Sequence, residues 1–418
     1  MNTKNIELLS PAGDLEKLKI AINYGANAVY MGGKSLGLRA KAKNFDYSEM
    51  EEGIRFAHKH NAKVYITANI FAHNDDFLGS EEYFKELYNM GVDALIISDF
   101  GLFSIAKKSV PNMEIHISTQ ANTTNYASCL FWKEVGASRV VLARELSFNE
   151  IKEIYEKTKE TGLELEAFVH GAMCISYSGR CLLSNYMTNR DANKGNCSHP
   201  CRWKYHLVEE IRPNEYMPVY EDERGTYIYN SKDLCMIENI DKMIESGIKS
   251  FKIEGRMKTS YYVAAVTKTY RQAIDDYLEN PEKYYSRREY YIEELKKSSH
   301  RNFTTGFYYN RPDGNEQIYT NNSYIRNYDF VGLVEGYCEE SGYAFIEQRN
   351  KFIVGDEVEV LRANGENFTQ IITEIRDLNG KDLNEAPHPK QKLKIKFNKP
   401  VEIYDILRKK EQIISENS

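Results

Sequence analysis

Residues 6–33 read IELLSPAGDLEKLKIAINYGANAVYMGG, and this stretch contains one complete strand–helix–strand unit. Ile6 to Ser10 and Ala28 to Gly33 are short apolar runs that end in small or polar residues, as buried parallel strands do. Asp14 to Tyr24 has helical periodicity, and Gly25 follows it, where a helix commonly ends in a left-handed residue. The stretch therefore predicts a βα unit of a parallel sheet.

The same unit recurs along the chain. Six further strands are expected at Lys63 to Asn69, Ala94 to Asp99, Glu114 to Gln120, Arg139 to Glu145, Glu164 to His170 and Ser250 to Glu254. Helical periodicity recurs at Tyr47 to His60, Ser80 to Met90 and Ser147 to Thr161, and Gly91, Gly136 and Gly247 mark helix ends as Gly25 does. Eight such units predict closure into a TIM-like (β/α)8 barrel, an α/β fold.

Two regions depart from this rhythm. A long connection between the seventh and eighth strands is rich in cysteine, and from about Tyr328 the periodicity changes to 2, with turns between short strands. Amphipathic helices are expected between these regions, at Ser260 to Leu278 and Ser286 to Ser299. We therefore expect a barrel over residues 1–260 with a Cys-rich insertion at 173–247, a helical extension over 261–327, and a small all-β barrel domain over 328–418.

Composition and charge set limits on function. The chain has 42% hydrophobic and 28% charged residues, as an ordinary soluble globular protein has, and no apolar run approaches the roughly 18 residues of a membrane-spanning helix. The first residues contain no apolar leader, so a cytoplasmic protein without membrane contact is expected. The net charge of -6 argues against nucleic-acid binding through overall electrostatics and leaves local basic patches as the alternative.

Five of the seven cysteines fall within the insertion: Cys174, Cys181, Cys197, Cys201 and Cys235. In a cytoplasmic protein such a group indicates metal or redox chemistry rather than disulfides. The flanking residues are glycine, serine, asparagine and arginine, which argues against the alternative that several of these cysteines are small core residues. Zinc ribbons usually show paired C-x2-C spacing, whereas the closest pair here has three residues between, so an iron-sulfur cluster is favoured over zinc.

Active sites of such barrels lie at the C-terminal ends of the strands. The polar residues predicted there are Ser10, Thr67, Asn69, Asp99, His116, Ser118, Gln120, Arg144, Glu145, His170, Glu254 and Arg256. For any single one, a structural hydrogen bond or ion pair is the commoner role. Arg144, His170 and Glu254 are the catalytic candidates.

Three motifs resemble those of the collagenase-like peptidases, the unassigned peptidase family thirty-two. They are EAFVHGAMCISYSGRCLLS at residues 166–184, ELLSPAG at 7–13 with AVYMGG at 28–33, and FKIEGR at 251–256. The resemblance extends over nearly the whole chain, and the small C-terminal β-barrel makes it strongest to the branch of the family that hydroxylates tRNA. It implies a 4Fe-4S protein that works with prephenate to form 5-hydroxyuridine at the wobble position of tRNA. Its cluster ligands would be Cys174, Cys181, Cys197 and Cys235, with Cys201 as an alternative ligand.

The resemblance also directs attention to basic residues. Prephenate is a dicarboxylate, and the planar fork of arginine suits carboxylates, so Arg39 and Arg256 are candidate substrate-binding residues, together with Arg144. Lys392, Lys394 and Lys396 alternate with apolar residues and would present three positive charges to tRNA phosphates from one face of a strand. The solvated face of an amphipathic strand explains these lysines equally well.

Two rival functions follow from the same sequence. One is a peptidase, as the family name states, although no His-Glu-x-x-His zinc motif is present. The other is a non-catalytic RNA-binding protein with a structural cluster or zinc. An iron-containing purified protein would argue against the plain peptidase, and turnover would argue against the purely structural role.

Overall fold

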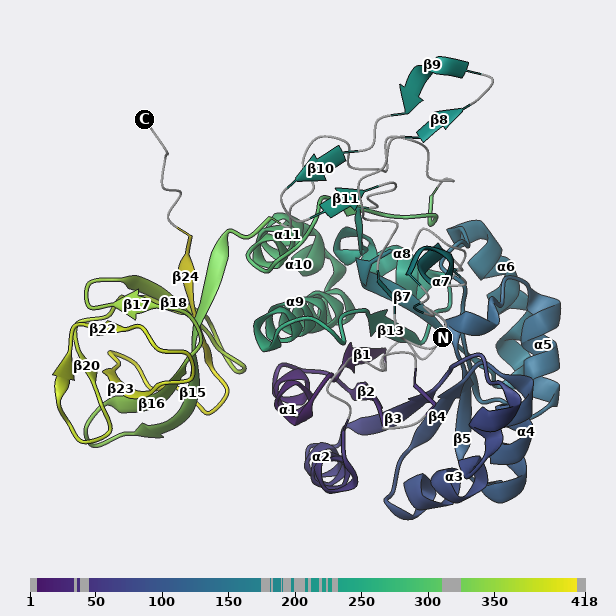
Figure 1. Ribbon diagram of the computed structural model, residues 1–418, viewed down its shortest axis with the longest axis horizontal. Coiled ribbons are helices and arrows are strands. Elements are labelled where there is room, and N and C mark those ends of the chain that lie inside the picture. The colour runs from purple at the N-terminus through teal and green to yellow at the C-terminus, as the bar shows by residue number, and fades with distance from the viewer. Residues whose placement is uncertain are drawn as a thin grey trace.

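Eight parallel strands form a closed barrel, as the sequence predicts (Figure 1). A computed structural model of the chain describes residues 6–33, 36–37, 45–173, 181, 183–188, 190, 197–198, 207–209, 212–217, 220–222, 225–227, 232–309 and 325–411. The barrel strands are β1 (Glu7–Pro11), β2 (Ala28–Gly32), β3 (Lys63–Ala68), β4 (Ala94–Ile97), β5 (Glu114–Ile117), β6 (Arg139–Val141), β7 (Glu164–Ala172) and β13 (Ser250–Ile253). Strand β13 pairs with both β1 and β7, and this pairing closes the ring.

Helices cover the outside of the barrel. The first six helices are α1 (Leu15–Asn23), α2 (Tyr47–Lys59), α3 (Ser80–Asn89), α4 (Phe100–Ser109), α5 (Tyr126–Glu134) and α6 (Phe148–Thr158). Their starts are set by capping side chains: Asp14 accepts from Lys17 N, and Asp46 and Ser147 form capping boxes. The four glycines predicted to end helices all have positive φ, from 85° to 102°, which confirms the predicted helix ends.

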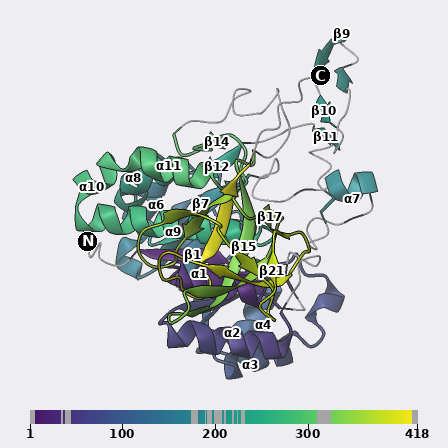
Figure 2. The same cartoon turned by 90° about the vertical axis from the view of Figure 1, so that its left-hand side faces the viewer.

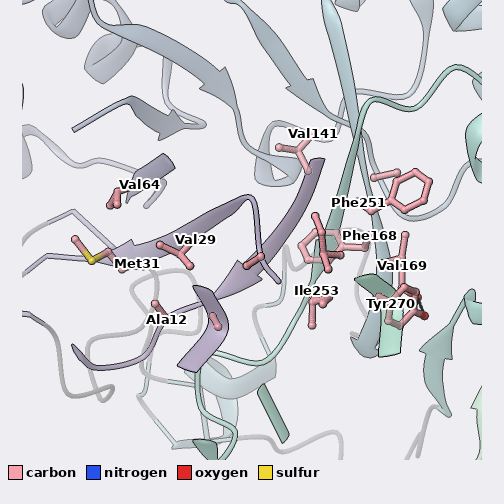
Figure 3. Packing of buried hydrophobic residues seen from close by; sticks show 14 of the residues in the cluster. Ala12, Val29, Met31, Val64, Val141, Phe168, Val169, Phe251, Ile253 and Tyr270 are labelled. Atoms are coloured by element: carbon pink, nitrogen blue, oxygen red, sulfur yellow. Dashed lines mark hydrogen bonds between the residues drawn. The ribbon is translucent and has the colours of Figure 1, made fainter. Parts of the chain in front are cut away.

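The barrel carries apolar side chains on both faces of its strands. Outward residues such as Leu8, Val29 and Val64 belong to the large core beneath the helices (Figure 3). Inward residues near the middle form a second cluster made of Leu9, Ala28, Tyr30, Tyr65, Ala94 and Ile96. This double-sided burial explains why the strands read as continuous apolar runs.

Charged groups fill the end of the barrel interior that lies near the starts of the strands. The buried Arg139 contacts Glu7, Glu164 and Glu166, and Lys252 Nζ lies 2.8 Å from Glu166. Burial alone would raise the pKa of Glu7, but attraction to Arg139 and hydrogen bonds from its neighbours lower it to about 2. These ion pairs therefore act as a packed ionic layer of the barrel.

The insertion leaves the barrel at the end of β7 and returns beside the same strand. Its described elements are α7 (Leu183–Thr188), β8 (Leu207–Glu209), β9 (Arg212–Met217), β10 (Tyr220–Asp222), β11 (Gly225–Tyr227) and β12 (Asp233–Cys235). Strand β12 pairs antiparallel with β7, with Asp233 opposite Ala172 and Cys235 opposite His170. In Figure 2, α7 and β9 to β11 lie on the right of the view, with β9 at the top, β10 and β11 below it and α7 lowest.

Helices follow β12 and β13. They are α8 (Ile240–Glu245), α9 (Ser260–Glu279), α10 (Pro281–Ser286) and α11 (Arg288–Lys296), and the short strand β14 (Phe303–Thr304) pairs with β12. Helix α9 packs against α1 and β1, so it takes the place of the eighth barrel helix. Among the described residues, no helix is long and apolar enough to cross a membrane.

An antiparallel half-barrel follows. Its strands are β15 (Tyr328–Cys338), β16 (Tyr343–Gln348), β17 (Phe352–Ile353), β18 (Glu357–Leu361), β19 (Phe368–Ile371), β20 (Ile375–Arg376), β21 (Asp382–Leu383), β22 (Glu385–Ala386), β23 (Lys392–Lys396) and β24 (Ile406–Lys410). The main sheet has the order β19-β18-β24-β15-β16-β23-β20-β21. Its inward apolar residues form a core of their own, as the period-2 pattern predicts.

The half-barrel is docked on the barrel through α1, α9 and α11 (Figure 1). Lys268 Nζ, on α9, donates to Arg362 O, Gly365 O and Asn367 Oδ1 of the half-barrel, at 2.7 to 3.1 Å. Burial lowers the pKa of Lys268 to about 8.

A second contact between the two domains is ionic. The fully buried Arg408 joins Glu294 of α11 to Glu359 of β18. Because Leu333, Leu361 and Ile406 of the half-barrel also belong to the barrel's large core, the contact between the domains is both ionic and apolar.

Candidate functional site

The C-terminal mouth of the barrel is built from polar residues at the strand ends. Asn69 Nδ2 donates to Ser118 Oγ at 3.1 Å, and Ser98 Oγ donates to Asn69 O at 3.1 Å, which ties the ends of β3, β4 and β5 together. Three predicted mouth residues lie elsewhere, and His170 is one of them. Ser10 hydrogen-bonds Thr267 of α9 on the outside of β1, and His116 is buried inside the barrel against Tyr65.

Arg256 lies at the mouth with only 6% of its surface exposed. Its Nη1 donates to Thr67 Oγ1 at 3.3 Å, and that hydroxyl in turn donates to Met31 O at 3.2 Å. Gly32 gives the guanidinium its room, because a Cβ at this position would lie 2.3 Å from Arg256 Nη2. Two neighbouring strands therefore fix the position of this cation.

Arg144 lies at the mouth on the other side, after β6. Its Nη1 donates to Ala172 O at 3.3 Å, and its guanidinium carbon lies 5.5 Å from the ring centroid of Phe168. Since Ala172 ends β7, Arg144 is held at the point where the chain enters the cysteine insertion. Its planar group is suited to an anionic substrate at this position.

Glu254 follows β13, and its neighbours connect it to Arg144. Tyr30 donates to Ile253 O at 2.9 Å and lies 3.4 Å from Glu254 Oε2. Lys252 Nζ lies 4.7 Å from the Tyr30 ring and 5.6 Å from the Phe168 ring, on which Arg144 also lies. The structure thus joins the catalytic candidates Arg144 and Glu254 through one continuous layer of side chains.

His170 occupies a different environment. Its ring packs among Tyr262 and Tyr270 of α9 and Phe303 of β14, and only 2% of the residue is exposed. Burial, with the nearby charge of Lys258, lowers its pKa to about 3, so the ring is neutral at neutral pH. Its packing explains a structural role, and its catalytic assignment stays a prediction.

The segments that carry Cys181 and Cys197 lie side by side. Ser184, at the start of α7, is 3.0 Å from Ser198 Oγ and accepts from Ser198 N at 3.0 Å. Thr188 of the same helix is 2.9 Å from Ser198 Oγ. Because these serines lie within three residues of the two cysteines, the fold brings two candidate ligand segments together.

Cys235 ends β12 beside β7. It is 7% exposed, its Sγ lies 3.8 Å from Tyr270 Oη, and burial raises the pKa of its thiol to about 12. Cys174 and Cys201 fall outside the described residues. Within the described part of the chain no group of three or more His, Cys, Asp or Glu side chains is placed to hold a metal ion, so the ligand set stays a prediction.

The remaining substrate-binding candidates are Arg39 and three lysines of the half-barrel. Arg39 lies outside the described residues. Lys392, Lys394 and Lys396 project from the outer face of β23 in the half-barrel, with Leu393 and Ile395 buried between them.

Sequence reasoning missed the ionic layer inside the barrel and the glycine that accommodates Arg256. A signal for the first was present, since Glu164 and Glu166 are charged residues two apart in a strand that should be apolar on both faces. Gly32 carried no such signal, because its role depends on Arg256, which is remote in sequence.

Comparisons with known proteins place the chain among relatives of similar length. The sequence profile of peptidase family U32 matches residues 13–318, and that of the U32 C-terminal domain matches residues 326–408. The tRNA hydroxylation protein P1 of Bacillus subtilis (strain 168) is 46% identical over 407 residues, which cover 97% of this chain and 95% of that protein. The tRNA hydroxylation protein P of Escherichia coli (strain K12) is 38% identical over 405 residues, covering 87% and 88%.

A ribosomal RNA enzyme is also similar. A 23S rRNA 5-hydroxycytidine synthase of Escherichia coli (strain K12) is 37% identical over 279 residues, which cover 67% of this chain and 41% of that protein. The tRNA hydroxylation proteins therefore match most of the chain, whereas the rRNA enzyme matches two thirds of it and less than half of its own length.

Proposed function

The chain belongs to peptidase family U32, and from this premise and the geometry of the barrel mouth we propose that it is an RNA hydroxylase. The RNA is a tRNA, and the product is 5-hydroxyuridine at the wobble position, formed with prephenate. The names of the tRNA hydroxylation proteins that match over most of the chain support this choice of substrate.

One structural observation carries the proposal. The mouth of the barrel contains the buried Arg256, fixed by Thr67, together with Arg144 and Glu254, and Cys174 comes two residues after the carbonyl that Arg144 contacts. Arginine forks bind a dicarboxylate such as prephenate, and a carboxylate is suited to moving a proton. In this assignment Arg256 and Arg144 hold the co-substrate, with Arg39 as a further candidate, and Glu254 is the acid–base group.

A 4Fe-4S cluster is the proposed cofactor. Its ligands are Cys174, Cys181, Cys197 and Cys235, with Cys201 as the alternative ligand. The adjacent segments of Cys181 and Cys197 fit such a group, and cysteine thiolates are its usual ligands. Cys235 fits only if its buried thiol gives up its proton, which metal coordination brings about. When bound, the cluster would supply electron transfer next to the mouth.

The peptidase alternative rests on the family name and on one short motif. Residues 33–37, Gly-Lys-Ser-Leu-Gly, have the spacing of a nucleophile elbow, which requires a strand before the serine and a helix directly after it. Ser35 falls outside the described residues, so the motif stays a prediction.

The direct test is a reconstituted reaction. The full chain, purified anaerobically, is incubated with an unmodified tRNA transcript and prephenate, and the nucleosides are analysed by mass spectrometry. The proposal expects one added oxygen on the wobble uridine, loss of this product without prephenate, and no cleavage of a peptide library. Peptide cleavage without any RNA product would reject the proposal.

The cluster has a separate readout. Iron and sulfide analysis and a visible spectrum should show about four irons per chain. Five single alanine variants are compared, at Cys174, Cys181, Cys197, Cys201 and Cys235, and four of them should lose the iron. Cys129, buried in the barrel core, provides the matched control, and Cys129→Ala should keep its iron. Zinc in place of iron would remove the redox cofactor from the proposal.

A further inference from the structure

The outer face of the half-barrel sheet combines aromatic and basic side chains. On β16 and β23, residues alternate between the core and the surface, so Phe345 and Lys394 project outward as a cross-strand pair. Tyr343 and Lys396 form the next pair along the same two strands. Each aromatic ring therefore has a lysine beside it on the neighbouring strand.

Phe345 is open to solvent on this face. It is 39% exposed, although a phenylalanine on a sheet surface would usually be covered by its neighbours. Its partner on the other side is Gly336 of β15, which has no side chain to cover the ring. The only cation on the ring among the described residues is Lys394, whose Nζ lies 5.6 Å from the centroid. The ring thus offers an uncovered apolar surface beside a positive charge.

The three lysines of β23 differ in their charge partners. Lys392 is paired with both Glu335 and Glu347, which neutralise it. Lys394 and Lys396 form no ion pair within the part of the chain that the structure describes; Lys394 donates to Leu378 O at 3.0 Å, and Lys396 lies over the Tyr343 ring. Two of the three positive charges are therefore available to an anion.

Tyr343 is held in place rather than exposed for contact. Its hydroxyl donates to Glu374 at 2.8 Å, and Arg376 lies 5.3 Å from its ring on the side of β20. It supports Lys396, which lies two residues from Lys394, so the two lysines are about 6.6 Å apart along β23. Both lysines can therefore contact phosphates of one nucleic-acid strand.

We infer that Phe345 stacks an unpaired base of the RNA substrate while Lys394 and Lys396 bind the adjacent phosphates. The inference rests on the proposed function and specifies the partner of the half-barrel as single-stranded RNA, such as a loop of tRNA. Base stacking on an exposed aromatic ring with flanking lysines is how β-sheet surfaces recognise single strands. The contacts between the domains use β15, β18, β24 and their loops, together with Arg349 just after β16, which pairs with Glu16 of α1. Phe345 keeps its 39% exposure in the docked molecule, so this face stays accessible.

The test is equilibrium binding of the full chain to a labelled, unmodified tRNA transcript over a series of salt concentrations. Phe345→Leu should raise Kd about 5- to 150-fold, since a stacked base contributes about 1–3 kcal/mol. Lys394→Gln and Lys396→Gln should each lower the slope of log K against log salt by about one. Thermal unfolding of each variant shows whether the fold is intact.

Matched controls are available on the barrel. Lys108→Gln removes an exposed lysine on α4, and Phe100→Leu removes an exposed phenylalanine on the same helix; both should bind as the wild type does. Wild-type Kd in Phe345→Leu with unchanged salt slopes in both lysine variants would overturn the inference. So would equal competition by duplex RNA or by an acidic peptide, which would make the face a general anion or protein contact.

The two proposals fail separately in these assays. Binding requires neither prephenate nor the cluster, so loss of affinity in Phe345→Leu without any hydroxylated product would reject the proposed function alone. Hydroxylated tRNA with affinity independent of Phe345 would reject the stacking contact alone.

Discussion

Arg256 donates to the hydroxyl of Thr67 at the barrel mouth, across 3.3 Å between two strands that are 189 residues apart in sequence. The bond fixes one edge of a buried cation, and Gly32 leaves the space for the other edge. A guanidinium held in this way is preorganised for a carboxylate, since less side-chain freedom remains to be lost on binding.

Replacing Thr67 by valine should weaken binding of the carboxylate co-substrate. The shape of the residue is kept, but the oxygen that positions Arg256 is lost. Under the proposed function we expect KM for prephenate to rise roughly tenfold, equivalent to about 1.4 kcal/mol, with a much smaller change in kcat. Steady-state hydroxylation kinetics measure both constants. Thr67→Ser restores the oxygen and should return KM to near the wild-type value; equal KM in all three proteins would contradict the positioning role.

A Cβ at residue 32 should displace Arg256 itself. Gly32→Ala places a carbon 2.3 Å from Nη2, so the arginine must move, and we expect a larger loss of co-substrate binding than in Thr67→Val. Overpacking of this kind costs about 1–3 kcal/mol of stability. Gly53 of α2 is the matched control, because a Cβ there is also overpacked, 2.8 Å from Leu18 Cδ1, but does not touch Arg256 or Thr67. If Gly53→Ala impaired binding as strongly, the effect would not come from Arg256.

Acid should destabilise the barrel through its ionic layer. The folded-state pKa of Glu7 is lowered to about 2, so its contribution to stability is complete above about pH 4.5 and is lost as the pH falls toward 2. Arg139→Met removes the cation responsible and leaves Glu166 buried, which should cost about 3–5 kcal/mol at pH 7. Urea unfolding at pH 7 and pH 3.5 measures this, and the variant should lose less stability than the wild type between the two. Lys85→Met, in an exposed pair with Glu81, should change stability by less than about 1 kcal/mol.

Docking of the half-barrel should depend on Arg408. Arg408→Met removes the buried cation and leaves Glu294 and Glu359 with Lys297 as their shared partner, and we expect a loss of about 3–5 kcal/mol. The half-barrel should then become a separate unit in limited proteolysis, with cleavage between the domains. Lys351→Met breaks only an exposed pair with Glu385 and should leave the digestion pattern unchanged.

The barrel could be predicted from the sequence because each strand has its own local pattern of residues. All eight predicted strands are present, since an apolar run and a following glycine or polar residue depend only on local sequence. Strand β12 was not predicted, because three residues within a long insertion carry no period, and its pairing with β7 is a tertiary contact. The ion-pair partners of Arg408 could not be predicted either, because Glu294 is 114 residues away in the sequence.

The sequence predicted most of the residues that lie at the candidate site, but it did not predict the direction of every side chain. Arg144, Glu254 and Arg256 lie at the mouth because the ends of parallel strands meet there. The side chain of His170 turns toward α9 because the pairing of β13 with β7 shifts between Lys252 and Ile253, leaving Val169 as an extra residue. A shift of one residue exchanges the two faces of a strand, and no pattern in the sequence marks it.

The antiparallel pairing of β12 with β7 has a consequence for how the protein can change over evolution. Ala172 and Asp233 lie opposite each other, so the insertion starts and ends at neighbouring points of one sheet. The cost of closing such a loop grows slowly, by only about 0.6 kcal/mol for each doubling of its length. Residues can therefore be gained, lost or exchanged in this segment while the barrel keeps its closure.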